Sequence, residues 1–542
     1  MAAKKNKAEK TTDFDEAAEK FPHFNRYIDN LDEHPEWLLE LPRGRDYSQP
    51  NFIYPVGDPI FIHIFKDEKE RVIYNVIEPT LNEEEEKLYD KVVDRLVSLS
   101  YKQSVPDEVT DIGPILLDLL DEIITTESAV KNFFNFTESK IRVTEEQYEK
   151  IKYYLIRNRV GYSKLQPLFY DPYLEDIHCT GVGTIKTQHK RFDMVYTNIE
   201  FRDDEELDSY ILDVTERVER PVSDAHPVVD SMMPDGSRAN FLYSREISKE
   251  GSSFTLRKFT DTPISITQIV DWGTMSPDLA GYIWLALENG MNLFVCGETA
   301  SGKTTTLNAI SAFIPPDDKV YTVENTPEVT MPHDVWQHLV TRESGKDSDV
   351  DYEELLIAAL RSRPDYIIVG EIRGVEGSIA FQAMQTGHPV MSTFHAGNVT
   401  TMIQRITGNP INVPITFIDN LNLVLIQQAV NRKGEKLRRV LSLTELERYY
   451  EPDDAMVTRE VVTWDPATDV HNFRGMYNSY ILEQKIAKML GYADTRKIYD
   501  VMKKRSHIIE RMIEEEIFNY YEVWETLQKF YYSGEEGLPF KI

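Results

Sequence analysis

The sequence is poor in cysteine, lacks long apolar runs and carries no excess of positive charge. Only two cysteines, Cys179 and Cys296, occur in 542 residues, too few for a disulfide framework or a four-ligand zinc site. No window approaches the roughly 18 uninterrupted apolar residues of a membrane span, and the opening MAAKKNKAEK lacks the apolar centre of a signal peptide. These absences predict an intracellular, reduced chain with no direct membrane span, which contacts a membrane only through a partner or a surface patch.

The charge balance argues against a nucleic-acid partner. A net charge of -31 repels phosphate backbones, and no basic stripe with interleaved aromatic residues is present. The chain is 41% hydrophobic and 28% charged, which is typical of a folded protein. Its length predicts roughly two to four domains.

Composition and periodicity change along the chain. Aromatic strands such as FIYPV and PIFIHIF mix with helical stretches in the first part, and a second part begins near Val143 with a helix whose Thr and downstream Glu fit a capping box. The predicted segments are a flexible tail (1–20), an N-terminal α+β unit (21–140), a second α+β unit (141–260), an alternating core (261–437) and C-terminal strands and helices (438–542).

The alternating core indicates the fold class. Apolar runs such as MNLFVC, KVYTV, YIIVGEI and VMSTFHA are each followed by a helical pattern. Such alternation predicts an α/β core, in which a mostly parallel sheet is covered by helices on both faces.

The strongest motif is GETASGKT, which starts at Gly297, follows the run MNLFVC and matches G-x-x-x-x-G-K-[ST]. The glycines let backbone amides curl around a β-phosphate at a helix N-terminus. Lys303 would neutralise β- and γ-phosphate oxygens, and the Thr304 hydroxyl would ligate Mg²⁺. The predicted ATP-binding residues are Gly297, Glu298, Thr299, Ala300, Ser301, Gly302, Lys303, Thr304 and Thr305.

Carboxylates end two further strands. The run YIIVGE ends at Glu371, and a parallel strand would deliver this carboxylate to the edge that carries the phosphate loop, facing Mg²⁺ and the γ-phosphate. A buried strand with a chance terminal acid is the alternative. In KVYTVENTPE, either Glu324 or Glu328 could act on water as a general base. A structural or surface role for one of the pair is the alternative.

A histidine and two arginines complete the candidate site. His395 ends VMSTFHA and would sense the γ-phosphate, whereas His388 precedes that strand and stays ambiguous. Arg238 in PDGSRANF and Arg257 in SSFTLRKF could each reach a phosphate bound in a neighbouring domain or subunit, as arginine fingers do. A packed histidine and ion-paired surface arginines are the alternatives.

Four of these motifs occur in a recognisable order. GETASGKTT, VYTVENTPE, LRSRPDYIIVGEIRG and TGHPVMSTFHAG resemble the Walker A motif, Asp box, Walker B motif and His box of the type II/type IV secretion ATPase family, which includes pilus and archaellum motors. NRVGYSKLQPLFYDPYLEDIHCTG, PDGSRANF and SSFTLRKF resemble its second N-terminal domain. The resemblance covers roughly residues 141–435.

The resemblance implies a RecA-like P-loop ATPase core joined to a PAS-like domain over 141–260 and assembled as a homohexamer that uses ATP and Mg²⁺. It places Glu328, rather than Glu324, at the catalytic glutamate of the Asp box. The other positions that it carries over are phosphate and Mg²⁺ binding by Lys303 and Thr304, the Walker B position at Glu371, the His box at His395, and nucleotide contacts by Arg238 and Arg257.

Departures from the bacterial pattern narrow the resemblance to its archaeal branch. The chain has no four-cysteine zinc insertion, carries Ala300 where glycine is usual, and reads ENTPE in the Asp box. These features and the long leading unit look like an archaellum or archaeal pilus ATPase, leaving the choice between the two open.

The function that we expect is ATP hydrolysis coupled to rigid-body domain movement. It would act on a membrane platform protein from the inner face of the cell membrane, with docking through the first unit or the helices after Tyr480. A RecA-like nucleic-acid-translocating ATPase and a non-hydrolysing scaffold are the alternatives.

Overall fold

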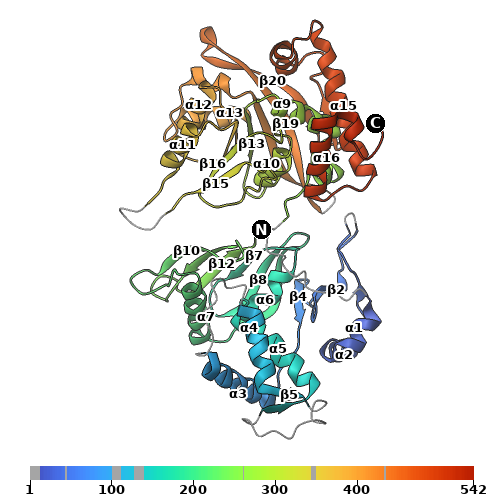
Figure 1. Ribbon diagram of the computed structural model, residues 1–542, viewed down its shortest axis with the longest axis vertical. Coiled ribbons are helices and arrows are strands. Elements are labelled where there is room, and N and C mark those ends of the chain that lie inside the picture. The colour runs from blue at the N-terminus through green and yellow to red at the C-terminus, as the bar shows by residue number, and fades with distance from the viewer. Residues whose placement is uncertain are drawn as a thin grey trace. The chain divides into compact units, whose positions relative to one another are not determined.

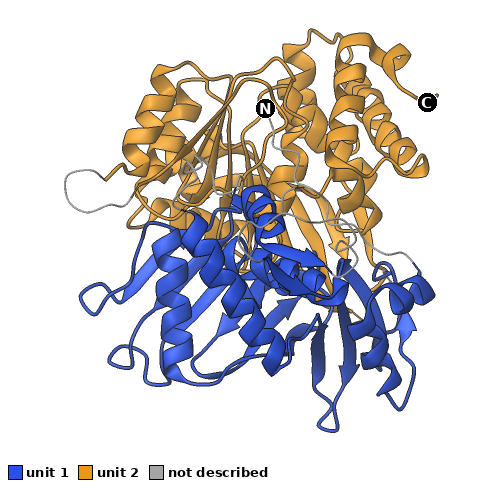
Figure 2. Ribbon diagram, turned by 60° about the horizontal axis from the view of Figure 1, so that its bottom comes forward, with its two compact units in different colours: residues 1–260 blue, residues 261–542 orange. Residues whose placement is uncertain are grey.

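The computed structural model describes residues 13–42, 45–100, 112–126, 140–259, 262–342, 349–432 and 435–542. The chain forms two compact units, residues 1–260 and residues 261–542 (Figures 1 and 2). Each unit has its own sheet and its own hydrophobic core. Across the described part of the chain, no helix is both long enough and apolar enough to cross a membrane.

The first unit is built on a ten-stranded sheet. Its strands are β1 (Glu36–Trp37), β2 (Asn51–Gly57), β3 (Ile60–Lys66), β4 (Val72–Ile77), β7 (Leu174–Cys179), β8 (Gly183–His189), β9 (Asp193–Phe201), β10 (Val228–Met232), β11 (Arg238–Leu242) and β12 (Ser253–Arg257). The spatial order is β1-β2-β3-β4-β9-β8-β7-β12-β11-β10. Because β4 pairs with β9, this sheet joins strands from both sides of residue 140, where the sequence predicts a boundary between units.

The first unit also contains seven α-helices and a small two-stranded parallel sheet within the described residues. The two strands are β5 (Ile124–Thr126) and β6 (Ile141–Val143). The helices are α1 (Phe14–Lys20), α2 (Pro22–Asp29), α3 (Glu83–Ser100), α4 (Ile112–Ile123), α5 (Glu145–Arg159), α6 (Gln166–Tyr170) and α7 (Asp204–Arg217). The capping box of α5 pairs Thr144 with Gln147, not with the glutamate that we expected. Glutamine meets the same need, since its side-chain carbonyl accepts the N-cap backbone N–H.

Residues 14–20 are helical, although the sequence predicts a flexible tail there; residues 1–12 of that predicted tail lie outside the described residues. Asp13 caps α1 by accepting two backbone N–H groups of the first turn. The ring of Phe14 lies 5.6 Å from that of Phe24 and 5.7 Å from that of Trp37. A helix of two turns is too short to show periodicity, and packing of this kind stabilises it instead.

The second unit carries a nine-stranded sheet. Its strands are β13 (Leu293–Gly297), β14 (Val320–Glu324), β15 (Trp336–Val340), β16 (Tyr366–Ile372), β17 (Val390–Phe394), β18 (Leu423–Arg432), β19 (Glu435–Tyr450), β20 (Ala455–Asp465) and β21 (Val470–Phe473). The spatial order is β15-β14-β16-β17-β13-β18-β19-β20-β21, in which strands from β15 to β18 run parallel and β19 to β21 add antiparallel neighbours. The predicted parallel core is confirmed, and its sheet continues past residue 437.

Helices cover both faces of this sheet (Figure 1). They are α8 (Ile266–Asp271), α9 (Pro277–Glu288), α10 (Lys303–Ser311), α11 (Tyr352–Arg361), α12 (Glu376–Gln385), α13 (Val399–Thr407), α14 (Ala487–Met489), α15 (Ile498–Glu514) and α16 (Tyr520–Ser533). Alternate residues of β13 enter different cores: Leu293 packs with α9, α10, α15 and α16, whereas Phe294 packs with α12 and α13. A central parallel strand needs apolar side chains in succession because it is buried on both faces.

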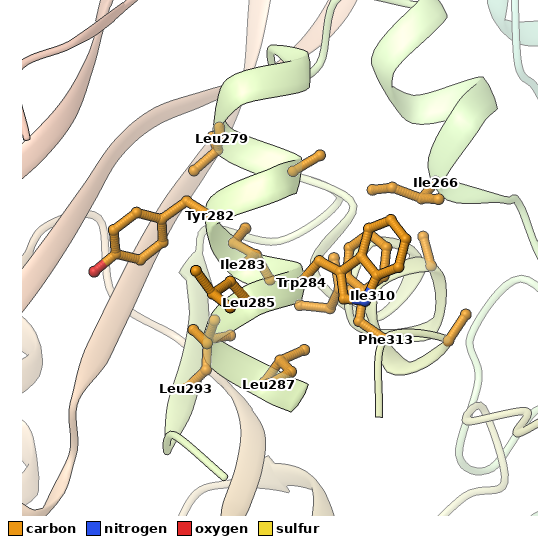
Figure 3. Packing of buried hydrophobic residues seen from close by; sticks show 14 of the residues in the cluster. Ile266, Leu279, Tyr282, Ile283, Trp284, Leu285, Leu287, Leu293, Ile310 and Phe313 are labelled. Atoms are coloured by element: carbon orange, nitrogen blue, oxygen red, sulfur yellow. The ribbon is translucent and has the colours of Figure 1, made fainter. Parts of the chain in front are cut away.

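Figure 3 shows part of the first of these cores around α9. The Trp284 ring stacks on Phe313 at the end of the phosphate-loop helix, with centroids 5.3 Å apart and an interplanar angle of 2°. Burial of a large apolar side chain contributes about 1.5–3 kcal/mol. The helix that follows the phosphate loop is therefore held firmly against the interior.

Candidate nucleotide-binding site

Four parallel strands deliver candidate residues to one edge of the second sheet. β13 ends at Gly297, β17 ends one residue before His395, and β14 ends at Glu324. Glu371 is the second-last residue of β16. These strands are consecutive neighbours in the order β14-β16-β17-β13. Since the carboxyl ends of parallel neighbours share an edge, this edge is where a doubly wound sheet binds its ligand.

The phosphate loop joins β13 to α10 through left-handed backbone. Gly302 has φ +89° and Ala300 has φ +60°. A side chain at Gly297 would place its Cβ 2.2 Å from the Gln427 carbonyl oxygen, so that position requires glycine. At Ala300 the left-handed conformation costs roughly 1–2 kcal/mol in a residue with a Cβ, a cost that glycine would avoid.

Lys303 begins α10, and its ammonium group turns back over the loop. Its Nζ donates to the Glu298 carbonyl oxygen at 3.0 Å. Burial lowers the pKa of Lys303, while the negative charges of Glu371 and Glu328 act in the opposite direction. Both carboxylates therefore favour the charged form of the same ammonium.

Gln427, which sequence reasoning missed, fastens the loop to the sheet. From buried β18 its Nε2 donates to the Ser301 carbonyl oxygen at 2.9 Å, and its Oε1 accepts from the Thr306 hydroxyl at 2.7 Å. A polar residue inside the apolar run LVLIQQAV was the available signal. The Ser301 hydroxyl itself is buried and has no hydrogen-bond partner among the described residues.

Glu371 is directed by a bulge in its strand. The pairing of β16 with β17 shifts between Val369 and Glu371, and the Thr393 hydroxyl donates to the Gly370 carbonyl oxygen at 2.7 Å. The Glu371 side chain is 23% exposed and forms an ion pair with Arg373, whose Nε lies 2.8 Å from Oε2. Bulges re-aim side chains next to active sites, and Arg373 is a second residue that we did not foresee.

Glu324 and Glu328 have different surroundings. Glu324 is 2% exposed; its Oε1 accepts the backbone N–H groups of Glu328 and Val329 at 3.0 and 2.9 Å, and its Oε2 lies 2.8 Å from His338 Nε2. Glu328 is half-buried, and within the described part of the chain we find no hydrogen bond to its carboxylate. Of these two glutamates, Glu328 is the one whose carboxylate is available to a reactant.

His395 touches the phosphate loop directly. Its Nε2 lies 2.9 Å from the Thr299 hydroxyl oxygen, and the Arg405 guanidinium donates to the His395 carbonyl oxygen. Burial and then the nearby Lys303 ammonium lower the pKa of the imidazole. The lowered pKa favours the neutral ring, which can exchange its Thr299 contact for a phosphate oxygen or a water. His388 lies at the opposite end of β17.

Arg238 and Arg257 belong to the first unit, whereas the phosphate loop belongs to the second. They face one another as directly opposed residues of β11 and β12, and both are exposed. The Arg257 Nε lies 3.1 Å from Asp176 Oδ1. Like charges directly opposite on a sheet repel, and the Asp176 carboxylate offsets this repulsion at Arg257.

The donors at the loop suit Mg²⁺ bound together with a triphosphate. The Thr304 hydroxyl and the Glu371 carboxylate offer only oxygen, the ligand type that Mg²⁺ prefers, and such sites take one or two protein ligands in addition to phosphate oxygens and waters. No group of three or more His, Cys, Asp or Glu side chains that could hold a metal by itself is found among the described residues.

A glycine-rich loop that leads from a central parallel strand into a helix, with lysine at the helix start and carboxylates on adjacent strand ends, defines a P-loop nucleotide-binding protein with a RecA-like core. Residues 162–537 match the family model described as "Type II/IV secretion system protein". The chain belongs to this family, and the predicted resemblance is confirmed.

Similar proteins occur in archaea and bacteria. The chain is 51% identical over 540 residues to the uncharacterized protein MJ0900 of Methanocaldococcus jannaschii, covering 97% of this chain and 98% of that protein. It is 24% identical over 221 residues to the type IV secretion system protein VirB11 of Bartonella quintana, covering 34% of this chain and 62% of VirB11. The Legionella pneumophila ATPase DotB matches 65% of this chain and 90% of its own, with 18% identity and a TM-score of 0.37.

Proposed function

We propose that this protein hydrolyses ATP and uses the energy to drive a filament or secretion machine of the type II/IV class. One observation carries the proposal: the phosphate-loop helix, which begins at Lys303, is hydrogen-bonded through Asn308 to the main chain of Glu328, and Glu371 lies near the end of a strand at the same sheet edge. Walker-type hydrolysis needs a cation for the transferred phosphoryl group, an acid near the metal and an acid for water. Membership of the secretion family supports the coupling to a machine.

Each residue at the loop has a distinct task in this proposal. The backbone N–H groups of 297–305 cradle the phosphates, and Lys303 neutralises the β- and γ-phosphate oxygens. Thr304 and Glu371 would hold Mg²⁺, which when bound neutralises charge that develops on the phosphates. Glu328 orients the attacking water and accepts its proton, because its carboxylate has no other hydrogen bond among the described residues.

His395 and the two arginines of the first unit would respond to the γ-phosphate. His395 already contacts the loop through Thr299, so a γ-phosphate would compete for its ring nitrogen. Arg238 and Arg257 act as nucleotide contacts in the family that the chain resembles, and their opposed positions on β11 and β12 suit an anion. Loss of the γ-phosphate would then release both contacts together and permit domain movement.

Family membership also suggests an oligomeric state, a location and a partner for this protein. We propose a homohexamer that acts from the cytoplasmic side of the cell membrane on an integral platform protein of an archaellum or type IV pilus-like system. The family membership and the archaeal relative support this assignment. Affinity capture of the full chain from detergent-solubilised membranes would recover such a platform protein, and native mass spectrometry with ATP would give the mass of six copies.

Phosphate release by the purified full chain with Mg²⁺ and ATP tests the hydrolysis. Lys303→Ala should abolish binding of a fluorescent ATP analogue and turnover together. Glu328→Gln should keep binding but slow turnover by about 10² to 10⁴-fold, the usual contribution of a general base. Glu353→Gln, at an exposed position of α11 in the same unit, is the matched control and should behave as the parent chain.

Two outcomes would contradict the assignment. Phosphate release unchanged by Lys303→Ala would point to a nucleotide-independent scaffold. Turnover stimulated by DNA or RNA, and not by membranes or a membrane partner, would favour a nucleic-acid motor instead.

A further inference from the structure

Glu328 lies in the segment between β14 and β15. Two side chains, those of Glu324 and Asn308, form hydrogen bonds to the main chain of this turn. On one side, the Glu324 carboxylate accepts the N–H groups of Glu328 and Val329 at 3.0 and 2.9 Å. On the other side, Asn308 contacts the carbonyl of Glu328 and the N–H of Thr330. Every one of these contacts is to the main chain, so the Glu328 side chain itself stays free to meet a reactant.

Asn308 makes its two contacts with one carboxamide. Its Nδ2 donates to the Glu328 carbonyl oxygen at 2.9 Å, and its Oδ1 accepts from the Thr330 N–H at 3.2 Å. Asn308 is 9% exposed and lies on α10, the helix that begins at Lys303. The carboxamide therefore links the phosphate-binding helix directly to the turn that carries Glu328.

A third group supports the same arrangement from the C-terminal helices. The Tyr520 hydroxyl, at the start of α16, lies 3.3 Å from the Asn308 carbonyl oxygen and 3.3 Å from the Thr330 carbonyl oxygen. The Asn308 side chain thus joins the helix to the turn directly, and the Tyr520 hydroxyl joins them a second time through the Asn308 main-chain carbonyl. Buried networks whose members are all satisfied are rigid.

We propose that Asn308 is a positioning residue for hydrolysis: it fixes the distance between the phosphate-binding helix and Glu328, so that the carboxylate stays aligned with the γ-phosphate. This role rests on the proposed function of Glu328. A displacement of about 1 Å of an aligned group can reduce a rate by about 100-fold. Removal of the carboxamide would loosen the turn without removing any group that touches the nucleotide.

The test uses the full chain with Asn308→Ala and with Asn308→Asp, which has the same shape but lacks the Nδ2 donor. Each should lower kcat tenfold or more, while KM and the affinity for a fluorescent ATP analogue change less than twofold. Asn292→Ala is the matched control, because Asn292 is 8% exposed and its carboxamide also makes two main-chain bonds, to the Asn420 carbonyl oxygen and from the Val390 N–H, beside the start of β13 and away from the Glu328 turn. That variant should keep the parental kcat.

A double-mutant comparison separates positioning from general damage. If Asn308 acts through Glu328, then Asn308→Ala should not reduce the residual turnover of Glu328→Gln any further. Parental kcat in both Asn308 variants would overturn the proposal, as would a further reduction by the same factor in the Glu328→Gln background. Loss of folding in both variants would also overturn it, since the carboxamide would then be purely structural. Full turnover by Glu328→Gln would instead refute the proposed function of Glu328.

Discussion

Three buried histidines and one half-buried histidine, His23, sit where the charged form of the ring is disfavoured. Burial lowers the pKa of His23, His63, His189 and His333 to about 4, against about 6.5 in an unfolded chain. Between these values the unfolded chain binds protons that the folded chain does not. The resulting stability is complete above pH 6.5 and is lost as the pH falls toward 4.

His189 offers the cleanest test of this effect. It is 1% exposed, its Nδ1 accepts the Arg191 N–H at 3.0 Å, and its Nε2 has no partner among the described residues. His189→Asn keeps an acceptor for Arg191 but cannot titrate. The variant should lose about 2 kcal/mol less stability than the parent when the pH is lowered from 7 to 5.

Urea unfolding followed by circular dichroism at pH 7 and pH 5 would measure that difference. His507→Asn, at an exposed position of α15, is the control and should retain the parental pH dependence. Equal pH dependence in the parent and in His189→Asn would contradict the expected proton uptake.

The apolar runs located the sheet edge that carries the phosphate loop, but without the family resemblance they could not separate Glu324 from Glu328. Both follow the strand KVYTV, and the difference between them comes from His338, whose ring meets the Glu324 carboxylate from β15. WQHLV has neither an apolar run nor clear alternation, so sequence patterning did not reveal this strand. A contact that depends on an unrecognised strand cannot be read from the motif alone.

At the scale of elements, β18 both borders β13 and anchors the phosphate loop through Gln427. Gln427→Met keeps the side-chain volume but leaves the Ser301 carbonyl and the Thr306 hydroxyl without their buried partner. Each such loss costs about 1–3 kcal/mol. We expect a lower free energy of unfolding and an ATP analogue affinity reduced about tenfold, as measured by denaturant titration and fluorescence.

Gln428→Met is the natural comparison, because Gln428 is the next residue of the same strand and is half-buried. This change should leave the affinity for the nucleotide close to that of the parent. An unaltered affinity in Gln427→Met would show that the loop keeps its shape without the strand.

Helices and strands with a clear hydrophobic periodicity were predictable from the sequence. Those stabilised mainly by tertiary contacts were not. The four parallel strands β13, β14, β16 and β17 and the helices between them followed from apolar runs and amphipathic spacing. By contrast, α1 depends on ring packing with Phe24 and Trp37. The second half of β18 is polar and half-exposed because it extends past the end of β13, with β19 still paired beside it.

At the scale of the whole molecule, the two units should respond differently to nucleotide. The phosphate loop and its carboxylates all belong to residues 261–542. Of the six tryptophans, only Trp37 lies in the first unit, so tryptophan fluorescence reports mainly on the second. Nucleotide at 100 times its Kd adds about 2.7 kcal/mol to the stability of the unit that binds it.

Thermal unfolding followed by fluorescence and by circular dichroism should therefore diverge when a non-hydrolysable ATP analogue and Mg²⁺ are added. The fluorescence transition should move to higher temperature, and part of the circular dichroism signal should not. Lys303→Ala should show no shift by either method. A single transition that moves as a whole would mean that the two units unfold together.

The Tyr520 hydroxyl has a mechanical consequence. Its two contacts, to the carbonyl oxygens of Asn308 and Thr330, attach α16 both to the phosphate-loop helix and to the turn that carries Glu328. Any force that displaces α16 must either rupture this phenol's bonds or drag the turn along with it. A pull on α16 would therefore be transmitted to this turn, and mechanical load would shift the position of the Glu328 carboxylate.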